Sequence, residues 1–116
     1  MSEADIKRAT IDALNATGLC LVWSTPSGHV QLRGGWMSLA PKGTPDVTGI
    51  ARDGRFIGIE IKKPGARTNK DRAKRQIDFQ GHIARLGGIS GQVESAAEAV
   101  TILLNAITIH NPKANT

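Results

Sequence analysis

Aromatic residues are scarce in this chain of 116 residues. There are no tyrosines, and phenylalanine and tryptophan together make up 3% of the sequence. Proteins that bind single-stranded nucleic acid through RRM or OB folds stack the bases on exposed aromatic rings. This composition argues against that class of binding. For a nucleic-acid partner it favours a duplex or branched molecule that is gripped through its phosphates.

Cysteine and long apolar runs are scarce as well. The single Cys20 cannot form a disulfide within the chain, and no cluster of cysteine and histidine indicates a zinc site. No segment approaches the run of about 18 apolar residues that spans a membrane, and residues 1–5 lack the basic region of a signal peptide. We therefore expect a cytoplasmic protein with no membrane partner.

Basic residues outnumber acidic ones, with 15 Lys and Arg against 10 Asp and Glu and a net charge of +5. Apolar residues make up 40% of the chain, which is typical of one globular domain with its own core. The charge suits a polyanionic partner, although many globular proteins share it.

The pattern of apolar residues, caps and glycines predicts an α/β domain over residues 1–110, followed by a frayed tail at 111–116. Ser2 and Asp5 predict the start of a first helix, and Gly18 its end. Further segments follow in chain order: a buried strand at 19–23, a strand at 30–33, a loop or partial strand at 36–42, strands at 47–52 and 55–63, a helix at 71–86, a strand at 89–94 and a helix at 95–107. This order is a helix, three or four strands, a helix, a strand and a helix, and with three strands it is the α-β-β-β-α-β-α order. It predicts a mixed β-sheet flanked by helices.

Two acids and a lysine indicate metal-dependent chemistry on phosphate. Asp46 follows a proline, while Glu60 and Lys62 alternate with isoleucines in an apolar run. Two carboxylates can hold Mg²⁺ against a phosphate oxygen and a water, and the metal lowers the pKa of that water. A nearby lysine can neutralise charge in the transition state or orient the water. By itself, the pair Glu60 and Lys62 also fits an amphipathic strand with a solvated polar face.

The hairpin loop near Gly54 decides whether the two acids meet. A three-residue loop at 52–54, with Gly54 in the left-handed conformation, places Asp46 opposite Glu60 on one face. A two-residue loop at 53–54 turns Asp46 to the other face. Because the chemistry requires both carboxylates on one face, we predict the first register.

Gln76 lies in an apolar row of the helix predicted at 71–86. The row continues with Phe79, Ile83 and Leu86, which we interpret as core residues. A glutamine in such a row is either a core amide with satisfied hydrogen bonds or a side chain that faces the metal site. We favour the second interpretation.

Seven of the fifteen basic residues fall within residues 62–75, where Asp71 is the only acid. A run of charge usually lies in solvent, but this one adjoins the two acids and would attract phosphate. We expect a DNA-binding surface formed by Lys63, Arg67, Lys70, Arg72, Lys74 and Arg75.

Glu3 has two interpretations. An acid in the first turn of a helix interacts favourably with the helix dipole. The same carboxylate can also serve as a third acid at the metal.

Several of these motifs, in this order, resemble the VRR-Nuc group of the PD-(D/E)xK nuclease superfamily, most closely its small stand-alone phage and bacterial members. The resemblance spans roughly residues 2–107. It is carried by Gly-Thr-Pro-Asp at 43–46, Glu-Ile-Lys-Lys-Pro-Gly at 60–65, Gln76, Phe79 and the glycine pair at 87–88.

The resemblance implies a restriction-endonuclease-like core and cleavage of phosphodiesters that depends on Mg²⁺ or Mn²⁺. By motif position, the implied site residues are the metal ligands Asp46, Glu60 and the backbone carbonyl of Ile61, with the catalytic lysine Lys62 and the motif glutamine Gln76. Glu3 matches an acid that the superfamily often carries on its first helix.

Stand-alone members of the group are homodimers associated with cleavage of Holliday junctions, while the same domain in larger repair nucleases acts on flaps. The chain lacks a Val-Arg-Arg tripeptide and has Ser24 where many phage members carry an arginine, which leaves the substrate preference open. We expect a structure-selective DNA endonuclease in the cytosol of a bacterium or a phage-infected host. The alternatives are a catalytically silent DNA-binding module of the same fold and a monomeric nuclease acting on flaps or duplex.

A homodimer interface is expected on the last helix. Apolar residues surround most of this helix, namely Ile102, Leu103, Leu104, Ala106, Ile107 and Ile109. One face of a sheet covers only one side of a helix, so the remainder needs either the first helix or a second copy. We predict a dimer with twice the 12.3 kDa mass of the chain.

Overall fold

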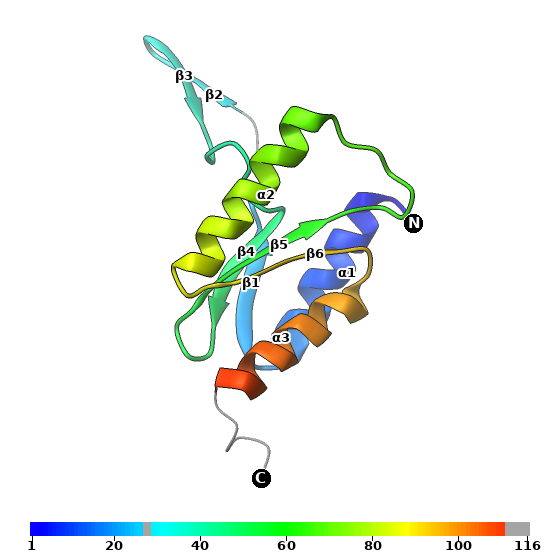
Figure 1. The fold of residues 1–116 in the computed structure, drawn as a ribbon. Helices are drawn as coiled ribbons and strands as arrows, with labels where there is room; N and C mark the ends of the chain where they lie inside the picture. The colour runs from blue at the N-terminus through cyan, green and yellow to red at the C-terminus, as the bar shows by residue number, and fades with distance from the viewer. Residues whose placement is uncertain (27–28, 111–116) are drawn as a thin grey trace.

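The computed structural model describes residues 1–26 and 29–110, in which a four-stranded mixed β-sheet is flanked by three helices (Figure 1). The spatial order of the sheet is β1 (Cys20–Ser24), β4 (Val47–Ala51), β5 (Phe56–Ile61) and β6 (Ile89–Val93). The pairs β1–β4 and β4–β5 are antiparallel, whereas β5 and β6 are parallel and are joined through α2 (Lys70–Arg85). The expected α/β class with a mixed sheet is confirmed. The predicted tail at 111–116 lies outside the described residues.

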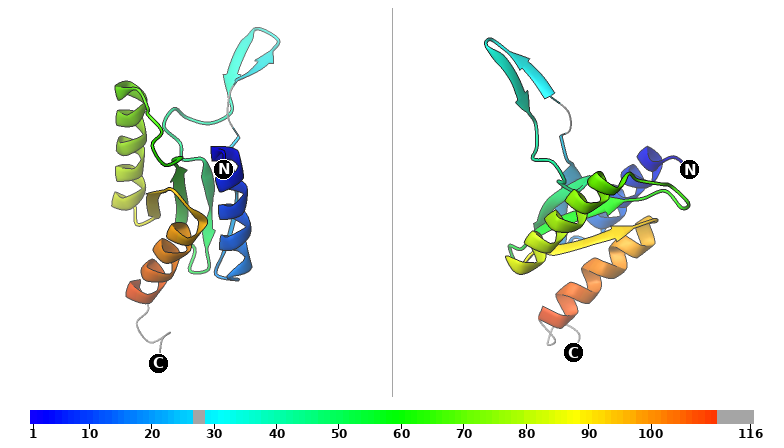
Figure 2. Two further views of the ribbon diagram at one scale, coloured as in Figure 1. Left: turned by 90° about the vertical axis from the view of Figure 1, so that its right-hand side faces the viewer. Right: turned by 45° about the horizontal axis from the view of Figure 1, so that its top comes forward.

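The helices cover the two faces of the sheet unequally. α1 (Glu3–Ala16) and α3 (Ala96–His110) pack against each other and against one face, while α2 packs over β5 and β6 on the other face (Figures 1 and 2). α1 begins with the predicted capping box, in which the Ser2 hydroxyl accepts a hydrogen bond from the Asp5 amide at 3.1 Å. None of the helices in the described part of the chain is long and apolar enough to cross a bilayer.

The main core lies between the sheet and the pair α1–α3. β5 contributes three buried isoleucines to it, Ile57, Ile59 and Ile61. The opposite face of β5 is buried too, because α2 lies close above it. The side chain of Ile83 in α2 occupies the place where a Cβ on Gly58 would be, at 2.6 Å. Because β5 is covered on both sides, it is not the amphipathic strand with a solvated polar face that the sequence allowed as an alternative.

A second sheet stands apart from this body. β2 (His29–Leu32) and β3 (Gly35–Ser38) pair antiparallel and project beyond the end of the main sheet (Figure 2). The sequence predicted the first of these strands at 30–33 but treated 36–42 as a loop or partial strand. Gly34, with φ of 104°, forms the turn that folds the two strands together, and this turn was not recognised.

Three positions that the sequence predicted to be buried are exposed. The segment at 19–23 was expected to be a buried strand, yet Leu21 is 61% exposed and Trp23 is also exposed. β1 is an edge strand that α2 does not reach, so only the face bearing Val22 is covered. Leu86 was expected in the core but is 89% exposed, because α2 ends there and its apolar row no longer meets the sheet.

The open edge of β1 carries one side-chain contact of its own. Asn15, near the end of α1, places its amide alongside Val22. The amide oxygen accepts from the Val22 N–H at 2.8 Å, and the amide nitrogen donates to the Val22 carbonyl at 3.0 Å. One side chain thus satisfies both outward-facing backbone groups in the middle of the strand.

α3 is largely covered within the monomer. Leu103 is buried, and the side chains of Ile102, Ala106 and Ile107 pack against the core. Among the α3 residues whose side chains are described, Leu104 is the exposed large apolar one, at 45%. α1 therefore covers α3, which is the alternative to a second copy that the sequence allowed. The predicted dimer interface on α3 is not supported.

Candidate active site

The two predicted acids meet at one end of the hairpin formed by β4 and β5. The Ala51 N–H donates to the Arg55 carbonyl at 2.8 Å across the loop, and Gly54 has a left-handed φ of 92°. This is the predicted three-residue loop. The ladder continues from it in register, so that Asp46, just before β4, lies opposite Glu60.

Asp46 is half-buried and fixed by the backbone of β5. Its Oδ2 accepts a hydrogen bond from the Ile61 N–H at 2.8 Å. Pro45, which precedes it, is fully buried, so the chain enters β4 along a rigid path. The carboxylate therefore has a defined position beside Glu60.

Glu60 is an acid in an unfavourable environment. Its side chain is 1% exposed, and within the described residues its Oε2 has no hydrogen-bond partner. Burial, and then the adjacent Asp46 carboxyl group, raise the pKa of Glu60 to about 8, against the weaker opposing charges of Lys62 and Arg72. Two neighbouring carboxyl groups and an unsatisfied oxygen thus form a site in which the nearby positive charges of Lys62 and Arg72 do not offset the cost of burial.

Gln76 connects Glu60 to Lys62. Its amide nitrogen donates to Glu60 Oε1 at 3.0 Å, and its amide oxygen accepts from Lys62 Nζ at 2.9 Å. The lysine also donates to Thr68 Oγ1 at 2.9 Å. Gln76 is only 5% exposed, and both of its hydrogen bonds go to residues of the candidate site. The interpretation that Gln76 faces the site is therefore supported by its contacts.

Glu3 lies on the α1 side of the same region. Glu3, Lys7, Asp46 and Ile61 help to line a cavity of about 160 Å³. Glu3 Oε1 also accepts a long hydrogen bond of 3.4 Å from the Lys63 N–H. In the described part of the chain, no three His, Cys, Asp or Glu side chains gather closely enough to form a metal site. Glu3 thus shares a cavity with Asp46 but does not complete a three-carboxylate cluster.

The donor set fits a hard divalent cation. Mg²⁺ is commonly held by one or two carboxylates, with waters and substrate oxygens completing its shell. Asp46 and Glu60 supply two carboxylates, Ile61 borders the cavity beside Asp46, and Glu60 Oε2 is an oxygen with no other partner among the described residues. These residues could hold Mg²⁺ or Mn²⁺.

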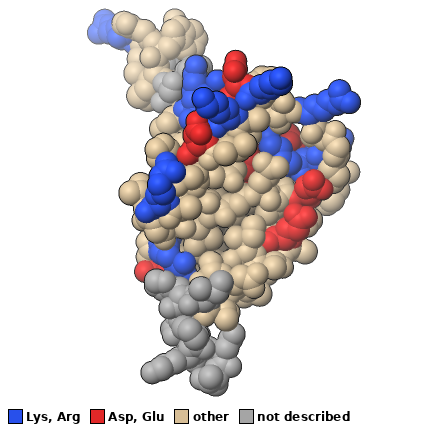
Figure 3. Space-filling model, in the orientation of Figure 1, with Lys and Arg blue, Asp and Glu red and all other residues tan. Residues whose placement is uncertain are grey.

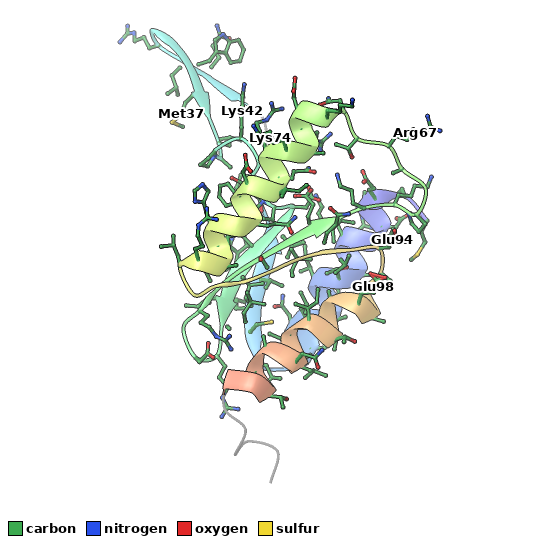
Figure 4. All side chains as sticks on the ribbon, in the orientation of Figure 1. Met37, Lys42, Arg67, Lys74, Glu94 and Glu98 are labelled. Atoms are coloured by element: carbon green, nitrogen blue, oxygen red, sulfur yellow. The ribbon has the colours of Figure 1, made fainter. Side chains whose placement is uncertain are left out.

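The basic residues form one exposed surface next to these acids. Lys and Arg gather over the upper end of α2 and along the loop that precedes it, where Figure 4 labels Lys74 and Arg67 (Figures 3 and 4). The exposed members that the sequence predicted are Lys63, Arg67, Lys70, Arg72, Lys74 and Arg75. The surface has the charge and position expected for contacts to phosphate.

Three contributors to this region were missed. Lys42 is exposed and immediately precedes Gly43, whose backbone packs against α2 at Arg75. Thr68 accepts from the catalytic lysine candidate, and Lys7 lines the small cavity. Lys7 stands one helical turn after Glu3, a spacing that could have identified it. Lys42 and Thr68 depend on loop paths that carry no periodic signal.

Comparisons with models of known protein families and with curated proteins give no match to this chain.

Proposed function

We propose that this protein is a metal-dependent DNA endonuclease with a restriction-endonuclease-like core, related to the small stand-alone VRR-Nuc nucleases. One observation carries the proposal. Glu60 is buried beside Asp46 with an unpartnered oxygen, and Gln76 links it to Lys62. An acid buried in this way beside a second carboxylate is costly unless a cation or a function requires it.

The metal site would use Asp46, Glu60 and the Ile61 carbonyl. A bound Mg²⁺ or Mn²⁺ would supply positive charge to a phosphate oxygen and lower the pKa of a water. The chain's own contribution is to hold the two carboxylates in register through the hairpin and to exclude bulk water from Glu60, which is 1% exposed.

Lys62 would act on the phosphate. Two of its three N–H donors are used by Thr68 and Gln76, which leaves the third for a phosphate oxygen or for the attacking water. In hydrolysis the water oxygen bonds to phosphorus and loses a proton, while the bond to the leaving sugar oxygen breaks and that oxygen takes up a proton. The ammonium group neutralises negative charge as it grows on the phosphate. Gln76 is a positioning residue, because it sets the separation between the ammonium group and Glu60.

The substrate would be DNA, held by the basic surface along residues 63–75. Branched DNA, such as a Holliday junction, is the substrate class we favour. Symmetric resolution of a four-way junction takes two incisions, and a two-fold homodimer supplies two active sites in the required relation. A monomeric chain would instead suit flaps or duplex, which need one incision.

Plasmid nicking tests the proposal. The wild-type protein is expected to nick supercoiled plasmid with Mg²⁺ or Mn²⁺ and to be inactive in EDTA. Glu60→Gln should be inactive in both conditions while it binds DNA as well as the wild type. DNA binding without cleavage by the wild-type protein would instead establish a catalytically silent DNA-binding module. A panel of labelled four-way junctions, flaps and duplexes then identifies the preferred substrate.

A further inference from the structure

Two apolar surfaces of this chain have no cover among the described residues. The first is the arm, which we define as residues 29–39. Its β2–β3 hairpin points away from the body in each view (Figure 2), so it cannot cover the body of its own chain. Trp36 is 69% exposed, and the other exposed apolar side chains of the arm are Leu32, Met37 and Leu39.

The second surface is the open sheet face, defined as Leu21, Trp23, Ile50 and Phe56. Leu21 pairs with Ile50, and Ile50 with Phe56, so these side chains form a row across three strands on the α2 side. α2 covers β5 and β6 but does not extend over β1, and each of the four side chains is about half exposed. A hollow of about 500 Å³, lined in part by Phe56 and Phe79, continues this face toward α2.

We propose that the arm of one copy packs on the open sheet face of a second copy, so that two chains exchange arms about a two-fold axis. The inference deepens the proposed function, because the second copy brings the second active site that a four-way junction needs. The arm and the face are different surfaces, so a closed pair makes the contact twice.

The composition of the arm favours a protein partner over DNA. Proteins bind DNA phosphates mainly through Lys and Arg, yet Arg33 is the single Lys or Arg of the arm, and the other large exposed side chains are mostly apolar. A two-stranded hairpin is also marginally stable alone in water, and packing on an apolar surface is what stabilises it.

The available area is sufficient for a stable dimer. Full burial removes roughly 60–120 Å² of each large apolar side chain from water. Eight half-exposed side chains on each copy therefore supply roughly 400 Å² of apolar area. This matches the apolar share of a standard interface of about 800 Å² per partner.

The arm is also attached to the candidate site. The Thr25 N–H, before the arm, donates to the Asp46 carbonyl at 2.9 Å, so the two ends of the arm segment meet at a metal-ligand candidate. A partner that fixes the arm would also fix the chain on both sides of Asp46. We therefore expect dimer formation to hold Asp46 more firmly beside Glu60.

Light scattering at micromolar protein, without DNA or metal, tests the proposal. The wild type should have twice the 12.3 kDa mass of the chain. An arm variant, Trp36→Asp with Met37→Asp, and a face variant, Leu21→Asp, should each be monomeric with unchanged circular dichroism. A mixture of the two variants should recover a weaker dimer at higher protein concentration, because the intact arm of one meets the intact face of the other and restores one of the two contacts. Leu104→Asp, a matched exposed position on α3, should remain dimeric.

A second measurement avoids added charge. Trp23→Phe leaves Trp36 as the single tryptophan, and its fluorescence should shift to longer wavelength on dilution as the arm is released. A wild-type monomer would overturn the proposal, and loss of DNA affinity in the arm variant would then assign the arm to DNA. If Leu104→Asp were monomeric while the arm and face variants stayed dimeric, the dimer interface would lie on α3. Failure of the mixed variants to pair even at high protein concentration would overturn the contact between arm and face. A dimer that forms normally but cleaves nothing would refute the nuclease and not the arm exchange.

Discussion

The two faces of the main sheet differ in what they bury. The face toward α1 and α3 is apolar and closed, with the isoleucines of β5 in its centre. The face toward α2 buries Glu60 and Gln76 and leaves Leu21 and Ile50 half open. The same strand serves both, since its residues alternate between them. Stability is thus concentrated on one face, which leaves the other free to carry groups that are unfavourable in a folded protein.

The largest expected effect lies on the α2 face. Glu60→Gln and Asp46→Asn should each reduce cleavage to background with Mg²⁺, because each removes a charge that holds the cation. DNA affinity, measured by fluorescence anisotropy in EDTA, should stay within about twofold because the basic surface is unchanged. Cleavage at the wild-type rate by either variant would remove both acids from the mechanism.

Lys62→Ala should slow single-turnover cleavage by on the order of 10²-fold, as expected for a group that stabilises the transition state. Lys63→Ala is the matched control, since Lys63 is exposed and lacks the contacts to Gln76 and Thr68. It should weaken DNA binding and reduce its salt dependence without changing the single-turnover rate. If Lys62→Ala instead weakened DNA binding without slowing single-turnover cleavage, Lys62 would be an ordinary phosphate contact.

The closed face should determine stability. Ile59→Ala is expected to lower the free energy of unfolding by about 2–5 kcal/mol, because Ile59 is fully buried in the core between the sheet and α1–α3. Ile50→Ala, on the neighbouring strand but half exposed on the other face, should cost about 1 kcal/mol or less when the chain is monomeric. Urea unfolding of the two variants compares the faces directly. Equal losses of unfolding free energy in the two variants would contradict the view that one face of the sheet provides most of the stability.

The last expected effect is a pH dependence of the stability of the metal-free protein. The pKa of Glu60 is about 8 when folded, against an ordinary value of 4.5, so the folded state retains a proton that the unfolded state has lost. The stabilising contribution is present below about pH 4.5 and is lost as the pH rises through about 8. The loss is on the order of a few kcal/mol at most.

Comparing Glu60→Gln with the wild type in thermal unfolding isolates this dependence. In EDTA the variant should gain stability relative to the wild type as the pH rises, and Mg²⁺ should stabilise the wild type more than the variant. A constant difference between pH 5 and 9 would mean that Glu60 is ionised throughout.

The acid pair could be predicted from sequence because its geometry is local. Gly54 allowed two loop lengths, and the requirement for both carboxylates on one face selected the length that brings Asp46 opposite Glu60. Helical spacing predicted the face of α2 on which Gln76 lies, but not its hydrogen bonds to Glu60 and Lys62. Sequence reasoning was less successful where the burial of a side chain depends on segments far away in the sequence. Packing between elements determines whether α1 covers α3 and how far α2 extends over the sheet. The exposure of Leu104 and Leu21 was therefore not predictable from the sequence.

The amide of Asn15 on the edge of β1 has a consequence for how copies of this chain can associate. A bare edge strand is a template on which a further strand, from any neighbour, can add by backbone hydrogen bonds, and repeated addition produces fibres. Here the central N–H and carbonyl of the edge are already occupied by Asn15. Addition of a further strand at the middle of this edge is therefore opposed, because these two groups are no longer available to a neighbouring backbone. Replacing this amide by an aliphatic side chain would expose the N–H and carbonyl of Val22 to backbone pairing with a neighbouring chain.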